Sequence, residues 1–278
     1  MASIDPRHRV VPAAPEGAAG CAAPTTHPAA QHACHDGREG WVHSVETGST
    51  VDGPGLRYVL FLSGCPLRCL YCHNPDTRHM HDGTCTPAAS ILAEIELLSG
   101  FLRHGHGGVT LSGGEPLVQP AFCARIFRGC KELGLHTALD TSGFLGSHAD
   151  DALLADTDLV LLDIKAFREA TYRTLTGATL RPTLEFAERL SLMGKPIWLR
   201  YVLVPGLTDN ADEIAGLAEF AAGLGNVERV DVLPFHKMGE PKWRALGLPY
   251  RLGDTQPPSA DLTERVYGMF RAAGLKTL

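Results

Sequence analysis

Short apolar runs recur along the chain from Trp41 onward, and a longer stretch of helical character separates each run from the next. Runs of Val, Leu and Ile bounded by Gly or Pro are typical of buried strands. We expect strands at residues 58–63, 108–112, 136–141, 159–164, 197–204 and 229–234. The stretches between and after them predict helices near residues 87–103, 120–133, 148–155, 168–176, 182–193, 210–223 and 260–273.

This alternation of strands and helices predicts an α/β fold. Continuous apolar strands are typical of parallel sheets that helices cover. Six strand–helix units are visible, whereas a closed (β/α) barrel has eight. In parallel barrels the reactive groups lie at the C-terminal ends of the strands, and this sequence places its unusual polar residues there.

Residues 1–40 have a different composition from the rest of the chain. They are rich in Ala, Pro, Thr and His and contain almost no large apolar side chains. Such a segment cannot bury enough surface to offset its ordering entropy, so we expect a disordered extension at 1–40 and an ordered domain at 41–278. Two alternatives stay open, a transit peptide and a second metal site. The site would use Cys21, Cys34, His27, His32 and His35, which are otherwise incidental.

The overall composition excludes several classes of protein. A chain of 278 residues with 44% hydrophobic and 20% charged residues is typical of a soluble globular protein. Its net charge of −6 argues against a surface for nucleic acid. No apolar run approaches the roughly 20 residues that span a bilayer, and no secretory signal is visible. We therefore expect reduced cysteines in a cytoplasmic, monomeric protein with neither membrane nor nucleic-acid partners.

Three of the cysteines lie close together. Cys65, Cys69 and Cys72 have the spacing Cys-x3-Cys-x2-Cys and directly follow the first predicted strand. Structural zinc sites use four ligands, usually as two separated pairs, and this chain has no second Cys-x2-Cys pair. Three thiolates suit an iron–sulfur cluster with one iron open to a substrate or cofactor. Cys85, in a predicted connection, is an alternative fourth ligand.

This spacing, with Tyr71 before the last cysteine, resembles the signature of the radical S-adenosylmethionine (SAM) superfamily. Residues 65–75, together with residues 52–55 upstream, resemble the pyruvate formate-lyase-activating enzymes. The resemblance extends from about Gly40 to the C-terminus. It implies an open partial (β/α)6 barrel of the radical SAM type, a [4Fe-4S] cluster on the three cysteines, and SAM at the open iron.

The resemblance also implies which residues hold SAM. Gly113, Gly114 and Glu115 end the second strand, where glycines let the backbone approach a ligand and a carboxylate accepts hydrogen bonds from an ammonium group. The alternative is a tight turn that starts a helix. The other positions implied to contact SAM are Tyr71, His73, Asn74, Asp163, Ile164, Lys165, Arg200 and His236. For His73 and Asn74, the substrate peptide is an equal possibility.

The third and fourth strands end in aspartates. Asp140, Thr141 and Asp163 resemble the family's site for a monovalent cation, potassium or sodium. A desolvated carboxylate is costly unless it is paired or metal-bound, so the alternative is that Asp140 caps a turn and Asp163 pairs with Lys165. Arg200 lies in an apolar strand and needs an anionic partner. The carboxylate or ribose of SAM would serve as that partner.

No Ser-His-Asp set, phosphate loop or acid–base pair is visible, so we expect a cofactor to carry the chemistry. The resemblance implies an activase that cleaves SAM reductively and removes a glycine α-hydrogen from pyruvate formate-lyase. It implies a flavodoxin- or ferredoxin-type electron donor. The residues implied to touch the substrate peptide are Asp52, Gly53, Pro54 and Gly55, for which a plain turn is the alternative.

Three other functions stay open. The partner could be a different glycyl radical enzyme, the substrate could be a small molecule, or the chain could be a non-catalytic zinc or electron-transfer module. The interval between His73 and Thr86 is too short for the ferredoxin-like domain that activases of other glycyl radical enzymes often carry. This length favours the pyruvate formate-lyase subtype.

Overall fold

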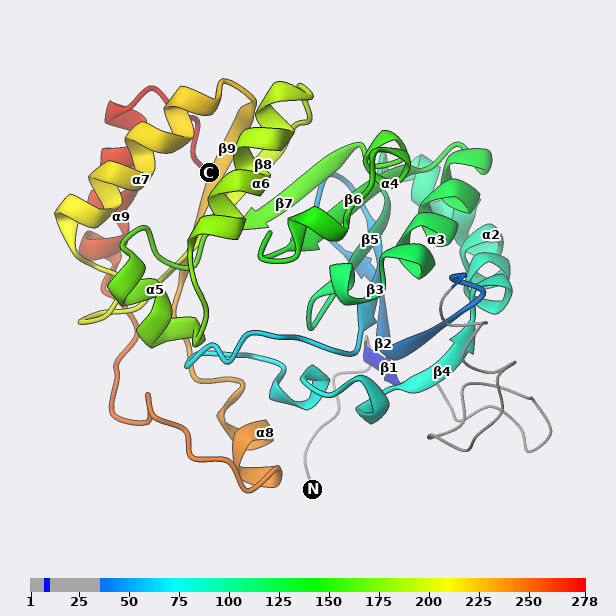
Figure 1. Cartoon of the computed structure of the whole chain (residues 1–278), viewed down its shortest axis with the longest axis horizontal. Helices are drawn as coiled ribbons and strands as arrows, with labels where there is room; N and C mark the ends of the chain where they lie inside the picture. Colours follow the sequence, from blue (N-terminus) through cyan, green and yellow to red (C-terminus); the bar gives the residue numbers. More distant parts are fainter. Residues whose placement is uncertain (1–7, 11–35) are drawn as a thin grey trace. The chain divides into compact units, whose positions relative to one another are not determined.

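The computed structural model describes residues 8–10 and 36–278, and these residues form two compact units (Figure 1). The first unit contains the described residues up to Pro66, together with Thr77–Asp140 and His148–Leu159. The second contains Leu67–Asp76, Thr141–Ser147 and Val160–Leu278. The chain therefore passes between the units several times, once within the cysteine motif.

The first unit is built on a mixed sheet with the strand order β1-β2-β3-β5-β6, and β4 pairs with β2. The parallel part begins at β3, whose Leu60 aligns with Leu111 of β5. On its other side β3 runs antiparallel to β2, where Leu60 aligns with Val45. The strands are β1 (His8–Val10), β2 (Glu39–Ser49), β3 (Arg57–Leu62), β4 (Thr84–Pro87), β5 (Gly108–Gly113) and β6 (His136–Thr141).

Two long helices, α2 (Ala88–His104) and α3 (Pro120–Glu132), pack side by side in the first unit (Figure 1). Each buries a stripe of apolar residues three or four positions apart, such as Ile91 and Ile95 of α2. The short helix α4 (Asp151–Ala155) starts where the Asp150 side chain accepts a hydrogen bond from the Leu153 amide. These apolar stripes cover the sheet.

The second unit contains three parallel strands, β7 (Leu159–Asp163), β8 (Ile197–Leu203) and β9 (Val227–Pro234). Their register places Asp163 directly opposite Arg200. Helices α7 and α9 pack against each other beside β9 (Figure 1). The helices are α5 (Glu169–Thr176), α6 (Arg181–Leu192), α7 (Ala211–Leu224), α8 (Glu240–Ala245) and α9 (Ala260–Ala272). Short 3-10 turns lie at Pro75–Thr77, Met80–Asp82, Pro116–Val118 and Gly146–His148.

The six expected strands are present, each within two residues of its expected bounds. The antiparallel strands β1, β2 and β4 and the short helix α8 were not predicted. β2 alternates buried and partly exposed positions, so it lacks the continuous apolar run that marks the parallel strands. Helix α8 has six residues, too few for a helical repeat to show.

The N-terminal boundary also differs from the expected one. We expected the ordered domain to begin at residue 41, but β2 begins at Glu39 and its partner β1 covers His8–Val10. Residues 1–7 and 11–35 of the expected disordered extension, including Cys21 and Cys34, lie outside the described residues. None of the described helices combines the length and apolar character needed to cross a bilayer.

A fully buried arginine, Arg57, joins the strands of the first unit to the loop before β3. Its guanidinium donates to Thr110 Oγ1 at 2.9 Å, to Val109 O at 2.5 Å and to Pro54 O at 3.3 Å. Thr110 Oγ1 in turn donates to Asp52 O at 2.6 Å. Burial lowers the pKa of Arg57 to about 10, so the side chain stays charged at neutral pH. This network fixes residues 52–54 to β5.

We expect Arg57→Lys to lower the free energy of unfolding by about 2–3 kcal/mol. Lysine keeps the charge, but its single nitrogen cannot replace a guanidinium that reaches three acceptors in different directions. Urea denaturation of the cluster-free protein measures the change.

The matched control is Arg128→Lys. Arg128 pairs with Asp156 on the surface, with 60% of its side chain exposed, so we expect a change within about 0.5 kcal/mol. Equal effects of the two substitutions would contradict the structural role of Arg57.

Candidate active site

The three cysteines of the motif lie in a segment without helix or strand, between β3 and the turn at Pro75–Thr77. In the first unit, the Cys65 amide donates to Arg78 O at 3.1 Å. In the second unit, the Arg68 amide donates to Thr176 O and the Leu70 amide to Leu175 O, at 2.7 and 3.0 Å. The backbone is therefore held by neighbouring segments.

The donor chemistry of this segment fits an iron–sulfur cluster. Cys65, Cys69 and Cys72 are each partly exposed. Cys69 is four Cα–Cα steps after Cys65 and Cys72 is three steps after Cys69, so chain length alone keeps these two pairs of Cα atoms within about 14 Å and about 11 Å. Among the described residues, no three His, Cys, Asp or Glu side chains are grouped to hold a single metal ion. The cluster ligands themselves stay a prediction.

Cys85, the alternative fourth ligand, is placed in β4 opposite Trp41 of β2, and its thiol lies 3.9 Å from Glu39 Oε2. It belongs to an antiparallel pair of strands, where we had expected a loop. The Cys85 thiol therefore contacts the Glu39 carboxylate within the first unit.

At the end of β5, two glycines allow close approach of the backbone. Gly113 has φ +118°, and a Cβ there would lie 2.2 Å from Leu62 N. A Cβ on Gly114 would lie 2.4 Å from Gly64 O. The Glu115 carboxylate is buried, and its Oε1 accepts a hydrogen bond from the Leu117 amide. That bond matches the alternative in which Glu115 begins a turn, and the close glycine packing sits against the residues that lead into Cys65.

The aspartate that ends β6 has a partner on β5. Ser112 Oγ donates to Asp140 Oδ2 at 2.6 Å. In the second unit, Thr141 Oγ1 accepts a hydrogen bond from the Gly143 amide at 3.0 Å. Both oxygens therefore belong to local hydrogen bonds of their own unit.

Asp163, at the end of β7, forms a largely buried ion-pair cluster with Lys165 and Arg200. Lys165 Nζ lies 2.8 Å from Asp163 Oδ2, and Arg200 Nε lies 3.2 Å from Asp163 Oδ1. Arg200 Nη2 also donates to Oδ2 at 3.2 Å. Arg200 thus has an anionic partner in Asp163, and its predicted contact with SAM stays a prediction. Ile164, between the two charged residues of β7 and its loop, is fully buried.

The electrostatics of this cluster keep Asp163 and Lys165 charged. Burial alone would raise the pKa of Asp163, but the charges of Arg200 and Lys165 outweigh it and hold that pKa below its ordinary value. Burial alone would lower the pKa of Lys165, but the Asp163 carboxylate raises it well above normal. The cluster carries a net positive charge, which favours an anionic group beside it.

Tyr71 lies beside these charges. The Lys165 ammonium is 5.9 Å from the centre of the Tyr71 ring. The Tyr71 hydroxyl is buried and has no hydrogen-bond partner within the described residues. Burial raises its pKa well above normal, so the group is a neutral donor. A buried hydroxyl without a partner costs about 1–3 kcal/mol, which a polar ligand atom would offset.

Two residues that follow the last cysteine contact the segment after β9. The rings of His73 and His236 meet edge to face, with centroids 5.1 Å apart. Asn74 Oδ1 accepts a hydrogen bond from Lys242 Nζ at 2.8 Å, and Trp243 Nε1 donates to Cys72 O at 2.8 Å. Sequence reasoning missed Lys242 and Trp243. The available signal was a tryptophan in a short connection rich in Gly and Pro.

Residues 52–55 form a turn in the first unit. Ser49 Oγ donates to Asp52 Oδ2 at 2.5 Å. Gly53 and Gly55 have φ +129° and +67°, and a Cβ on Gly55 would lie 2.3 Å from His106 O. Asp52 and Pro54 are partly exposed, so a second chain has access to them.

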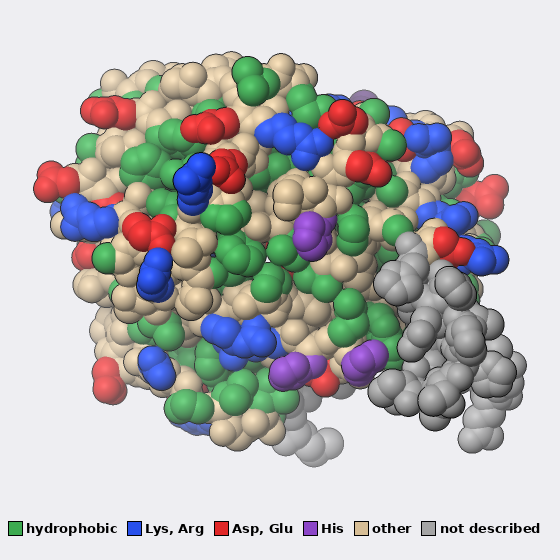
Figure 2. Space-filling model, viewed as in Figure 1, with side chains coloured by type: hydrophobic (Ala, Val, Ile, Leu, Met, Phe, Trp, Pro, Cys, Tyr) green, Lys and Arg blue, Asp and Glu red, His purple; other side chains and the backbone are tan. Residues whose placement is uncertain are grey.

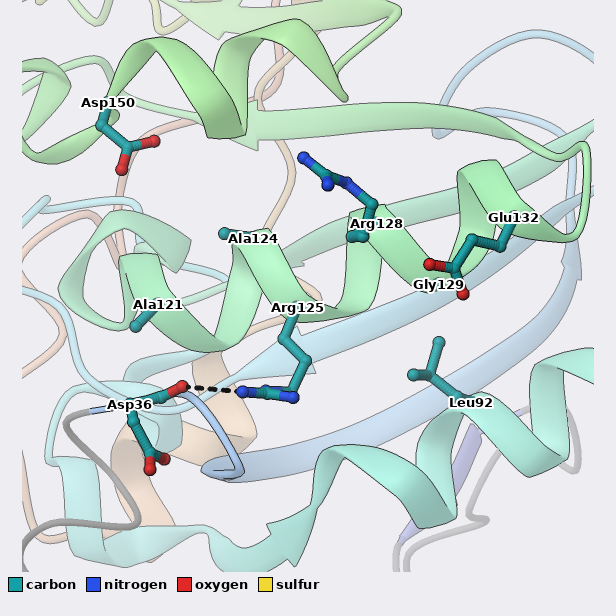
Figure 3. Close-up of a pocket in the computed structure, with 9 residues that line it drawn as sticks. All are labelled: Asp36, Leu92, Ala121, Ala124, Arg125, Arg128, Gly129, Glu132 and Asp150. Carbon is teal, nitrogen blue, oxygen red and sulfur yellow. Dashed lines mark hydrogen bonds between the residues drawn. The ribbon is translucent and has the colours of Figure 1, made fainter.

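A hollow of about 510 Å³ lies over α3 in the first unit, away from every predicted site residue. Figure 3 shows Arg125 and Arg128 projecting from α3 toward it. Arg128 pairs with Asp156 at 2.6 Å, and Arg125 donates to Asp36 O at 3.3 Å. The two arginines that line the hollow thus already have partners within the protein. On the face drawn in Figure 2, positive and negative side chains are interspersed.

Comparison with known proteins places this geometry in a family. Residues 59–221 match the model of the radical SAM superfamily. The "Pyruvate formate-lyase 1-activating enzyme" of Escherichia coli strain K12 is 42% identical over 241 residues, which cover 86% of this chain and 98% of that protein.

Solved structures agree. A domain of pyruvate-formate lyase-activating enzyme from Bacteroides vulgatus is 26% identical with a TM-score of 0.53, covering 62% of this chain and 98% of that one. A radical SAM methyltransferase from Sphaerobacter thermophilus is 18% identical with a TM-score of 0.60, covering 87% and 73%, and shows the fold alone. The chain belongs to the radical SAM superfamily and, within it, to the family of pyruvate formate-lyase-activating enzymes.

Proposed function

We propose that this chain activates pyruvate formate-lyase by removing an α-hydrogen from one of its glycines, which leaves a stored glycyl radical. The observation that carries the proposal is the run of three cysteines, Cys65, Cys69 and Cys72, on one irregular segment. The partner comes from the name of the Escherichia coli relative, which matches over 98% of its own length.

Enzymes of the radical SAM superfamily use a [4Fe-4S] cluster and SAM, and the donor set of this chain suits that cluster. Cys65, Cys69 and Cys72 would hold the cluster, and when bound and reduced it would supply the one electron that cleaves SAM to methionine and a 5′-deoxyadenosyl radical, which would take the glycine hydrogen to give 5′-deoxyadenosine. The protein's own work is to hold the reactants in place and to exclude water and competing hydrogen donors.

Residues at the strand ends are proposed to hold SAM. Gly113 and Gly114 let the backbone approach the methionine end, and Glu115 accepts from its ammonium group. The positive cluster of Asp163, Lys165 and Arg200 favours the SAM carboxylate, since its two cations exceed its one anion. The remaining proposed contacts are Tyr71, His73, Asn74, Ile164 and His236; the unpartnered hydroxyl of Tyr71 supports the first.

A monovalent cation is proposed at Asp140, Thr141 and Asp163. Because Asp163 already contacts two cationic side chains, we expect the ion to bind weakly. The one-electron supply requires a reductant, proposed to be a flavodoxin- or ferredoxin-type protein. The working state is proposed to be a cytoplasmic monomer.

The central experiment is anaerobic reconstitution with iron and sulfide, followed by reduction and addition of SAM. We expect a brown protein that forms 5′-deoxyadenosine and generates a glycyl radical on pyruvate formate-lyase, detected by electron paramagnetic resonance. Cys69→Ala should abolish cluster and radical, because it removes one of three ligands. The matched control Cys85→Ala should retain both.

Other outcomes would identify a different function. A colourless, zinc-loaded protein would contradict the proposal. Formation of 5′-deoxyadenosine with a radical on a different glycyl radical enzyme, and none on pyruvate formate-lyase, would reassign the partner.

Asp163→Asn should lower the free energy of unfolding at pH 7 by about 3–5 kcal/mol and weaken SAM binding. The substitution preserves shape but leaves the charges of Lys165 and Arg200 buried without their carboxylate. Urea denaturation and equilibrium dialysis with SAM measure the two effects. Glu185→Gln, which removes the exposed pair with Arg181, is the control and should change stability by less than about 0.5 kcal/mol.

The loss of stability caused by Asp163→Asn should also depend on pH. The folded-state pKa of Asp163 is depressed, so its contribution is present above the unfolded value of about 4 and is lost as the pH falls through the folded pKa. The difference between wild type and Asp163→Asn should therefore shrink in acid. A constant difference across that range would show that the carboxylate charge is not its cause.

Asp52→Asn should separate docking from chemistry. Asparagine retains an oxygen for the Ser49 hydroxyl but removes the charge that the proposal directs at the substrate peptide. We expect glycyl radical formation to slow about tenfold at limiting pyruvate formate-lyase, as for loss of one charged hydrogen bond. Cleavage of SAM without the partner should stay within about twofold of wild type. Glu96→Gln, on the exposed side of α2, is the control.

A further inference from the structure

The segment Leu67–Asp76 carries two of the predicted cluster ligands but has no helix or strand of its own before Pro75. Its shape must therefore come from its neighbours. The last turn of α5 supplies one set of contacts, since Thr176 O and Leu175 O accept from the amides of Arg68 and Leu70. These contacts hold the part before Tyr71. The part that contains Cys72 is held by a different element.

That element is the short stretch from Gly239 to Trp243, at the start of α8. The indole Nε1 of Trp243 donates to Cys72 O at 2.8 Å, and the side chain is 6% exposed. The Tyr250 ring packs against the indole, with centroids 5.6 Å apart at 60°. The indole is thus oriented on one side by packing and on the other by the carbonyl of a cluster ligand.

The backbone at Gly239 also comes unusually close to the backbone of Cys72 and His73. A Cβ on Gly239 would lie 3.0 Å from both Cα and O of His73 and 3.2 Å from Cys72 O. Such distances are tighter than ordinary contact, so a larger residue here would push the segment away. Glycine at this position allows direct packing on residues 72 and 73.

Lys242 contacts the C-terminal end of the segment Leu67–Asp76. Its Nζ donates to Asn74 Oδ1 at 2.8 Å and lies 3.2 Å from Asp76 Oδ2. Because Lys242 and Trp243 are consecutive, one rigid helical turn engages residues 72, 74 and 76 together. We name residues 239–243 the α8 clamp.

We propose that the α8 clamp fixes the third cluster ligand, with Trp243 positioning Cys72 and Lys242 positioning Asn74. This inference rests on the proposed function, because it assumes that Cys72 binds the cluster. Outer partners that orient a metal ligand typically contribute about 10–100-fold to metal affinity. The clamp acts through the backbone of Cys72, so its loss should release the cluster faster and alter its electronic surroundings.

The test uses the full-length chain with Trp243→Phe, which keeps an aromatic ring against Tyr250 but removes the N–H donor. After anaerobic reconstitution, the rate of iron transfer to a colorimetric chelator should rise about tenfold. The electron paramagnetic resonance spectrum of the reduced cluster should shift, with and without SAM. The unfolding midpoint of the cluster-free variant should stay within about 4 °C of wild type, as for loss of one hydrogen bond.

Three further variants complete the design. Lys242→Met should speed iron release as well, and Lys242→Arg should restore most of the wild-type rate because it keeps a cationic donor. Arg244→Gln is the control on the same helix, since Arg244 pairs with Glu240 on the surface and does not touch the cysteine segment. We expect its spectrum and iron release to match wild type.

Several outcomes would overturn the inference. One is a Trp243→Phe protein with wild-type iron release and an unshifted spectrum. Another is an equal defect in Arg244→Gln, which would assign the effect to helix α8 in general. If the wild-type chain assembles no iron–sulfur cluster, the proposed function itself fails, and that result is distinguishable because it precedes any comparison of variants.

Discussion

The segment proposed to carry the cluster ligands is irregular and cannot hold its own shape. Residues 63–74 lack the repeating backbone hydrogen bonds of a helix or strand, so each ligand position depends on contacts from outside. Thr77 and Arg78 bind the backbone before Pro66, the end of α5 binds the residues around Cys69, and α8 binds Cys72. A cluster needs its ligands at defined positions, and the surrounding elements supply that definition.

Buried charge is the second constraint, and both units satisfy it in the same way. In the first unit, Arg57 is fully buried and directs its donors to carbonyl and hydroxyl oxygens of β5 and the loop before β3. In the second, Asp163 contacts two cations and has a depressed pKa. Charged side chains held in this way are oriented before a ligand binds, so binding requires little reorganisation of the protein.

The parallel strands were predictable because their burial on both faces leaves a continuous apolar run in the sequence. The antiparallel strand β2 was not, since it is buried on one face and reads as a mixed segment. The Asp163–Lys165 pair was among the predicted alternatives because the two residues are neighbours in sequence. The contact of Arg200 with Asp163 depends on the register of β7 and β8, which local pattern does not encode.

The sequence by itself determined the kind of chemistry. Cysteine spacing, the Gly-Gly-Glu turn and the strand-end carboxylates are local patterns, and local spacing is enough to limit which ligands a short loop can present. Only the tertiary structure decided how that loop is held. Trp243 and Cys72 lie 171 residues apart, and Lys242 and Asn74 lie 168 apart, so their hydrogen bonds exist only once the chain has folded. Contacts of that range follow from topology, because no local pattern links one side chain to the other.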